Sequence, residues 1–116
     1  MNWKHAGILL AIVGVACAGV WIYQANSAAT RGEKAFQRLG CGGCHFSGAG
    51  PNLTHIVRNQ DAHLLERFIA SPSTVYRERD MKSLNEGYML MPDMHATPED
   101  ARDIVAYLEE MNREAK

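Results

Sequence analysis

The N-terminal part of the chain is a continuous apolar stretch. Residues 6–23 carry no charged side chain, and a helix of that length is roughly 27 Å long, close to the thickness of the hydrocarbon core of a bilayer. Trp3 precedes the stretch, and Trp21 and Tyr23 close it, as is typical of aromatic side chains at the two membrane interfaces. The pattern predicts a transmembrane helix, with residues 1–24 as an N-terminal anchor.

Two other interpretations compete with a retained anchor. Ala25-Asn26-Ser27 is a passable cleavage site for a signal peptide, although a signal peptide has a shorter apolar core. Cys17 would be the processing site of a lipoprotein, but Gly14 stands where a large aliphatic residue is wanted. The length of the stretch therefore favours the anchor.

Small residues recur along one face of this helix. Gly7, Ala11, Gly14 and Ala18 follow each other at helical spacing, and a face of small residues lets a second transmembrane helix approach closely. Glycine and alanine are also common in membrane helices without a partner. The stripe is interpreted as a contact surface for a partner helix.

Beyond residue 24 the pattern changes to short helical repeats separated by polar segments. Residues 25–31 are small or polar and are expected to form a short linker. Thr30 and Glu33 have the spacing of a capping box, which predicts a helix with Thr30 as its N-cap that runs to about Leu39. Gly40 is well placed to end it.

Two further helices are predicted towards the C-terminus. The first runs from Asp61 to about Ala70, and Pro72 excludes Ser71 from it. Residues 76–94 show no clear period and are interpreted as a loop. The last helix follows the N-cap Thr97 and runs to about residue 113, with the proline and acidic residues typical of a first turn. Its apolar face comprises Ala101, Ile104, Val105, Leu108 and Met111. Residues 32–116 are thus predicted to form one all-α domain.

The candidate chemistry lies between the first two of these helices, in Cys41-Gly42-Gly43-Cys44-His45. A C-x-x-C-H run is the attachment signature of a c-type haem: both thiols add to the haem vinyl groups, and the adjacent imidazole binds the iron. A redox disulfide or half a zinc site is the competing interpretation of a C-x-x-C pair, but the chain has no second pair. The run predicts one covalent haem c on Cys41 and Cys44, with His45 as an iron ligand.

Charge and compartment narrow the class of protein. The chain has 116 residues and a formal net charge of −1, so it lacks the basic surface expected of a protein that binds nucleic acid. Covalent haem attachment takes place outside the cytoplasmic membrane. The run therefore predicts a single-pass protein of the bacterial inner membrane, with its haem domain on the periplasmic side and its N-terminus in the cytoplasm.

Further motifs accompany the attachment run: Gly32-x-x-x-Phe36, Gly50-Pro51-Asn52-Leu53, Met91-Pro92 and Ile104-Val105-Ala106-Tyr107-Leu108. With them the chain resembles the class I cytochromes c, of the small bacterial kind with a membrane anchor, over about residues 30–111. The resemblance implies a cytochrome c-like fold in which Gly32 and Phe36 pack across Tyr107, where the terminal helices of the domain cross. It also implies that the carbonyl of Pro51 accepts a hydrogen bond from Nδ1 of His45.

The resemblance also suggests which residues contact the haem propionates. Arg58, in a GPNLTxxxxR-type loop, is expected to pair with a propionate; a solvated surface arginine is the alternative. Asn52 and Tyr88 are further candidates for hydrogen bonds to the same groups.

The second iron ligand is sought among Met89, Met91, Met94 and His95. The family pattern is a methionine directly followed by proline, which selects Met91. A thioether opposite histidine raises the reduction potential, whereas His95 would give a haem with two histidine ligands and a lower potential. His5, His55 and His63 have surface interpretations that need no metal.

The predicted function is outer-sphere electron transfer by a protein that has two axial ligands and no substrate of its own, and hence is not itself an enzyme. Redox proteins of a membrane electron-transport chain are the expected partners. Because the linker is short, we expect either a small subunit of a respiratory or photosynthetic complex or a laterally mobile carrier between complexes. A haem sensor with an open iron site is the alternative from another class. The mixed charges of Tyr76–Asp80 are interpreted as a docking surface or a solvated insertion.

Overall fold

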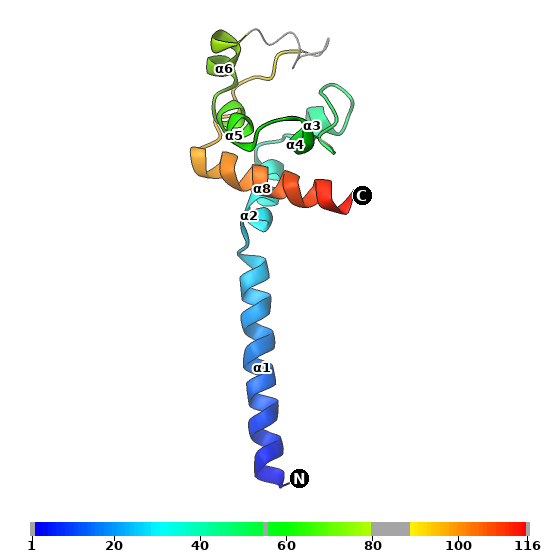
Figure 1. Ribbon diagram of the computed structural model, residues 1–116, viewed down its shortest axis with the longest axis vertical. Coiled ribbons are helices and arrows are strands. Elements are labelled where there is room, and N and C mark those ends of the chain that lie inside the picture. The colour runs from blue at the N-terminus through cyan, green and yellow to red at the C-terminus, as the bar shows by residue number, and fades with distance from the viewer. Residues whose placement is uncertain (1, 55, 80–88, 116) are drawn as a thin grey trace.

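The computed structural model describes residues 2–54, 56–79 and 89–115. Its described residues form helices and connecting segments with no β-strand. The molecule measures 71 × 28 × 24 Å, because one long helix projects from a head that contains all the others (Figure 1). The all-α prediction is confirmed.

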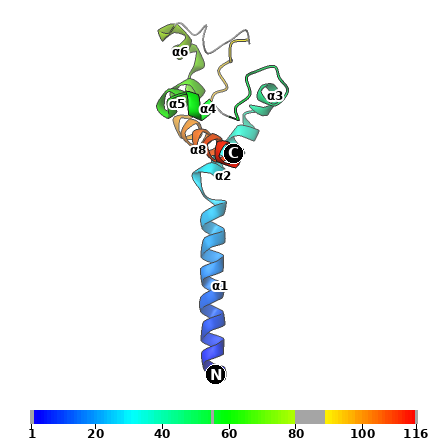
Figure 2. The ribbon, with the colours of Figure 1, turned by 45° about the vertical axis from the view of Figure 1, so that its right-hand side comes forward.

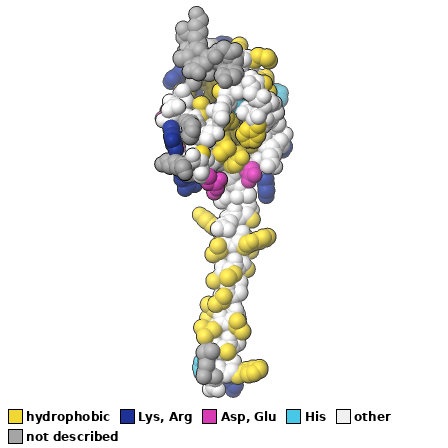
Figure 3. Space-filling view, turned by 90° about the vertical axis from the view of Figure 1, so that its right-hand side faces the viewer, with side chains coloured by type: hydrophobic (Ala, Val, Ile, Leu, Met, Phe, Trp, Pro, Cys, Tyr) yellow, Lys and Arg dark blue, Asp and Glu magenta, His cyan; other side chains and the backbone are white. Residues whose placement is uncertain are grey.

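The projecting helix is α1, Trp3–Ala25, and it buries none of its residues. Its mean hydropathy of 2.2 and its length suffice to cross a membrane, although a signal sequence would satisfy the same criteria. Hydrophobic side chains are spread along α1, and charged side chains appear only at its free end and on the head (Figure 3). The predicted apolar helix is therefore present.

Helix α2, Ala28–Arg38, begins earlier than the sequence analysis predicted. Its N-cap is Ser27, whose side chain accepts a hydrogen bond from the backbone N–H of Thr30 at 3.2 Å. The prediction of Thr30 as N-cap is wrong, because a serine with the same spacing lies three residues upstream. Only Asn26 and Ser27 separate α1 from α2, so most of the segment expected to be a linker is helical. Gly40, with φ of 73°, follows the end of α2 as predicted.

Helix α8, Pro98–Glu114, packs across α2. Thr97 and Asp100 form the capping box at its start, with Pro98 in the first turn, which confirms the predicted helix start. The crossing occurs at Gly32, where a Cβ atom would lie 1.9 Å from the backbone oxygen of Asp103. Phe36 packs edge-on against Tyr107, their ring centroids 5.5 Å apart. The predicted crossing of the terminal helices is therefore confirmed.

Four shorter helices lie between α2 and α8 in the described part of the chain: α3, Gly42–His45; α4, Ile56–Asn59; α5, Ala62–Ala70; and α6, Pro72–Glu78. Asp61 caps α5 as expected, and Ser71 is non-helical between α5 and α6. The prediction of a loop from residue 76 is wrong for Tyr76–Glu78, which belong to α6. A helix of seven residues is too short to establish a period. Asp80, the end of the predicted docking segment, lies outside the described residues.

The core of the head joins these elements. Ala35 and Phe36 from α2, Leu53 from the segment before α4, and Ile104 and Leu108 from α8 form one buried cluster. This cluster lies along one side of a large cavity, whose other walls come from α3, α5, α6 and the segment that carries Met91.

Candidate functional site

The cavity contains about 870 Å³ of space, part of which is open to solvent. Its walls are mainly apolar and include Phe36, Leu65, Phe68, Ile104 and Leu108. An apolar cavity lined by several helices of a small domain is suited to a mainly apolar group.

His45, at the end of α3, lines the cavity. Its Nδ1 atom lies 2.9 Å from the backbone oxygen of Pro51. A carbonyl oxygen only accepts, so Nδ1 must carry the proton and donate. The lone pair of Nε2 is then free to bind a metal ion, with the ring orientation fixed by Pro51. The hydrogen bond expected from the resemblance is present.

The loop that follows α3 is fitted closely around this imidazole. The backbone N–H of Gly50 donates to the carbonyl of Cys44 at 2.9 Å. A Cβ atom at Gly50 would lie 3.3 Å from Nδ1 of His45, so glycine lets the loop pass directly beside the ring. Further along, the buried side chain of Asn112 on α8 donates to the carbonyl of Leu53 at 3.1 Å. The loop that holds His45 is therefore tied to the last helix.

Cys41 and Cys44 are free thiols on one helical turn. Cys41 is half-buried and lines the cavity. Burial, more than the nearby Cys44 thiol, raises the pKa of Cys41, although its own backbone N–H acts in the opposite direction. Cys44 is exposed. Cys41 therefore lies on the cavity wall, and Cys44 follows it by three residues, directly before His45.

Two of the four candidates for the second iron ligand lie on the cavity wall, both in one segment without regular secondary structure. Met89 and Met91 line the cavity, whereas Met94 and His95 do not. Met89 is 85% exposed, and Met91 is half-buried. The backbone N–H of Met91 donates to the hydroxyl of Tyr76 at 3.0 Å. The structure therefore brings Met91 to the cavity with a specific support from α6.

Tyr76 is a site residue that the sequence analysis did not identify. It lines the cavity and packs edge-on against Phe68, with ring centroids 5.3 Å apart. Gln60 also lines the cavity and was not predicted. A tyrosine within a charged segment gives no sequence signal for a hydrogen bond to a residue fifteen positions later.

Of the residues expected to contact the haem propionates, Arg58 and Asn52 do not line the cavity. Arg58 lies on α4 with its side chain exposed, and it is not a wall residue. Asn52 is exposed and accepts a hydrogen bond from the backbone N–H of Thr54 at 2.8 Å. Tyr88 and His55 lie outside the described residues. The contact of Arg58 with a propionate stays a prediction.

The cavity wall carries the thiol of Cys41, the oriented imidazole of His45 and the thioether of Met91, and the thiol of Cys44 lies next to His45 in the chain. These groups fit an iron porphyrin, since each donor type suits haem iron or its covalent attachment. The fold and the site thus define a small all-α haem-binding domain. A family model described as Cytochrome c matches residues 29–112, and the chain belongs to the cytochrome c family. No curated protein and no solved structure matched the chain.

Membership of this family establishes the cofactor and the general role. Cytochromes c carry covalently bound haem c, and a small domain of this kind carries one. The protein is a haem-based electron carrier, in a family whose members typically transfer electrons and are not catalysts.

Proposed function

We propose that the protein is a membrane-anchored monohaem cytochrome that transfers electrons by an outer-sphere route. The observation that carries this proposal is the placement of His45 and Met91 on the walls of one apolar cavity, with Cys41 beside them. Two axial ligands leave no coordination position for a substrate. When bound, haem supplies one-electron chemistry at its iron.

The residues around the cavity have separate roles in holding the haem. Cys41 and Cys44 hold the porphyrin edge through thioether bonds, and His45 supplies the nitrogen ligand from α3. Met91 supplies a sulfur ligand, which favours the reduced iron and so raises the reduction potential. The apolar walls exclude water, and a water-poor site limits the rearrangement that accompanies each change of charge.

Location follows from the same residues. A chain that carries haem on thioether bonds has its haem domain outside the cytoplasmic membrane, so we place the head on the periplasmic side and the N-terminus in the cytoplasm. The length and apolarity of α1 support a retained, single-pass anchor. Detection of residues 1–24 in the mature protein by intact mass, together with its recovery in the membrane fraction, tests this placement.

As partners we propose the redox proteins of a membrane respiratory or photosynthetic complex, of which this chain is a small subunit. The stripe of Gly7, Ala11, Gly14 and Ala18 supports a partner helix, and there is open space around Gly7 and Gly14. Purification in mild detergent should then recover the cytochrome with other membrane subunits. Recovery of free monomer alone would favour a laterally mobile carrier.

The ligand assignment is tested by replacing Met91. In Met91→Ala, the far-red absorption of a sulfur–iron bond should be lost, and the reduction potential should fall, because the thioether no longer stabilises the reduced iron. Optical spectra of the ferric protein and a potentiometric titration measure both effects.

Met89→Ala is the matched control, since Met89 lines the same cavity but is largely exposed. It should keep the far-red band. Persistence of the band in Met91→Ala, or its loss in Met89→Ala, would contradict the assignment. Rapid binding of carbon monoxide by the reduced wild-type protein would instead indicate an open iron site and a sensor.

A further inference from the structure

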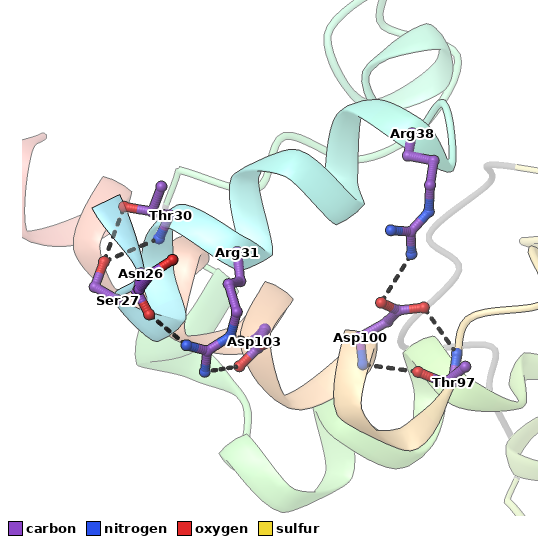
Figure 4. Close-up of polar contacts among 8 residues, drawn as sticks. All are labelled: Asn26, Ser27, Thr30, Arg31, Arg38, Thr97, Asp100 and Asp103. Atoms are coloured by element: carbon purple, nitrogen blue, oxygen red, sulfur yellow. Dashed lines mark hydrogen bonds and ion pairs between the residues drawn. The ribbon is translucent and has the colours of Figure 1, made fainter. Parts of the chain in front are cut away.

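The connection between α1 and the head is short and extensively hydrogen-bonded. Asn26 and Ser27 are the two residues between α1 and α2. Ser27 caps α2, and the hydroxyl of Thr30 donates to the carbonyl of Gln24 in the last turn of α1 at 2.9 Å. These contacts leave little rotational freedom at the connection (Figure 4).

Arg31 joins three parts of the chain at this point. Its Nε and Nη2 atoms donate to Oδ2 and Oδ1 of Asp103 on α8, at 2.9 and 3.1 Å. Its Nη1 atom donates to the carbonyl of Asn26, directly after α1. One guanidinium group on α2 therefore contacts both the end of the anchor and the helix that forms one wall of the cavity (Figure 4).

The chemistry of this contact favours a single geometry. Asp103 is only 7% exposed, and a buried carboxylate requires a charged or hydrogen-bonding partner. The guanidinium group is planar, with donors in a fixed fork, so it binds both carboxylate oxygens in one plane and still directs a third N–H to a carbonyl. The hydrogen bond to Asp103 raises the pKa of Arg31 above its usual value, although burial acts in the opposite direction; the charges of Asp103 and Glu99 add to the increase.

The contact also determines where the cavity lies relative to α1. In Figures 1 and 2, α3, α4, α5 and α6 all lie on the side of α8 that faces away from α1. A change in the angle between α1 and α2 would swing the whole head, and the cavity with it.

We propose that Arg31 is a positioning residue that fixes the head on its anchor, so that the haem is presented to its redox partner at one height and one orientation above the membrane. This inference rests on the proposed function, because it takes α1 to be a retained membrane anchor. A head held in this way suits a partner that is itself fixed in the same membrane. A partner that must be reached by a swinging head would need a flexible tether, for which glycine- and serine-rich segments are suited.

The test is a distance measurement that uses the cysteines already present. In the holoprotein Cys41 and Cys44 are bound to haem, so Cys17 on the exposed surface of α1 is the free thiol and accepts a nitroxide label. Pulsed electron paramagnetic resonance between the nitroxide and the ferric low-spin haem gives a distribution of distances in lipid nanodiscs. We expect one narrow distribution for the wild-type protein. In Arg31→Gln it should broaden by about twofold or more, because Asn26 is no longer joined to Asp103 and only the hydrogen bonds of Ser27 and Thr30 still hold the connection.

Arg38→Gln is the matched control. Arg38 also joins α2 to α8, through an ion pair with Asp100 at 2.8 Å. Hydrogen bonding to Arg38 and to Thr97 lowers the pKa of Asp100. Arg38 makes no hydrogen bond or ion pair to α1 among the described residues, so the distribution should stay narrow in this variant. The double variant Arg31→Gln/Asp103→Asn leaves no unpaired carboxylate and should broaden the distribution even if the single variant folds poorly.

A broad distribution in the wild-type protein, or a narrow one in both Arg31 variants, would overturn the inference. In either case an intact optical spectrum and retention in the membrane would leave the proposed function standing. Loss of residues 1–24 from the mature protein would contradict both this inference and the proposed membrane anchor. Intact mass detects that loss and so distinguishes it from a change in the distance distribution.

Discussion

Met91 reaches the cavity from a segment without regular secondary structure, and one hydroxyl group supports its backbone there. The N–H of Met91 donates to Oη of Tyr76 at 3.0 Å. Tyr76 is in turn held edge-on against Phe68. The thioether is therefore positioned from α6, although no side chain of α6 is proposed to bind the iron.

Tyr76→Phe should weaken this support and keep the aromatic packing. Loss of one hydrogen bond is worth about 1 kcal/mol, so an external ligand such as imidazole should displace Met91 with an apparent affinity increased by about fivefold. Titration of the far-red band with imidazole measures the change. Tyr107→Phe is the control, because Tyr107 packs on Phe36 at the helix crossing. Equal imidazole affinities in wild type and Tyr76→Phe would refute the supporting role.

At the scale of single residues, the sequence predicted what is local. Cys41, Cys44 and His45 lie in one short run of the sequence, and the contact of His45 with Pro51 was expected from the family resemblance. Tyr76 and Asn112 could not be found in this way, because their partners are backbone groups of distant segments. A backbone N–H or carbonyl in a distant segment has no sequence signature, so these two side chains are identified only when the fold is known.

Among the helices, the crossing of α2 and α8 is the closest contact in the head. A Cβ atom at Gly32 would lie 1.9 Å from the oxygen and 2.4 Å from the carbon of the Asp103 carbonyl. Both are backbone atoms of a helix and cannot move aside as a flexible side chain can. The two helices approach closely because residue 32 has no side chain.

Gly32→Ala should therefore destabilise the protein even though alanine is the better helix former. The gain in helix propensity is about 1 kcal/mol, whereas forced separation of packed elements costs roughly 1–3 kcal/mol or more. A contact as short as this one belongs at the upper end of that range of costs. We therefore expect the free energy of unfolding to fall by about 2 kcal/mol. Guanidinium unfolding of the ferric holoprotein, followed by circular dichroism, measures it. Gln37→Ala, on the exposed face of α2, should be close to neutral; a more stable Gly32→Ala protein would disprove the close crossing.

The elements that the sequence predicted well carry redundant signals. The start of α8 combines a capping residue, a proline and acidic side chains, and all three features predict the same first residue of the helix. Near the start of α2, Ser27 and Thr30 are both hydroxyl residues of the kind that cap helices. In the structure Ser27 is the N-cap, and the hydroxyl of Thr30 donates to the carbonyl of Gln24 instead. Helix α6 was missed because Pro72 was taken only as the end of α5. Proline in a first turn also begins a helix.

For the molecule as a whole, the cavity occupies the centre of a small head. The buried cluster contains Ala35, Phe36, Leu53, Ile104 and Leu108, and about 870 Å³ of space adjoins it. A domain of this size buries little apolar surface, and the apolar cavity among its helices reduces the contacts that they make with one another. Haem, which binds the folded state, supplies the missing contacts.

Protein prepared without haem should accordingly show no cooperative thermal transition, while the holoprotein unfolds in one step. Differential scanning calorimetry of both forms, with dye binding to exposed apolar surface as a second measure, checks this. Apoprotein made by omitting haem maturation and the variant Cys41→Ser/Cys44→Ser should behave alike. A sharp transition in the apoprotein near that of the holoprotein would show that the head folds without its cofactor.

The position of α2 and α8 between the anchor and the cavity has a consequence for the direction of electron flow. With α1 in a bilayer, α2 and α8 would lie between the membrane and the haem, as a layer at least one helix diameter, roughly 10 Å, thick. A carrier dissolved among the lipid tails cannot reach the cofactor from below. In that arrangement, a donor or acceptor that contacts the head outside the lipid would approach the cofactor more closely than one that stays among the lipid tails.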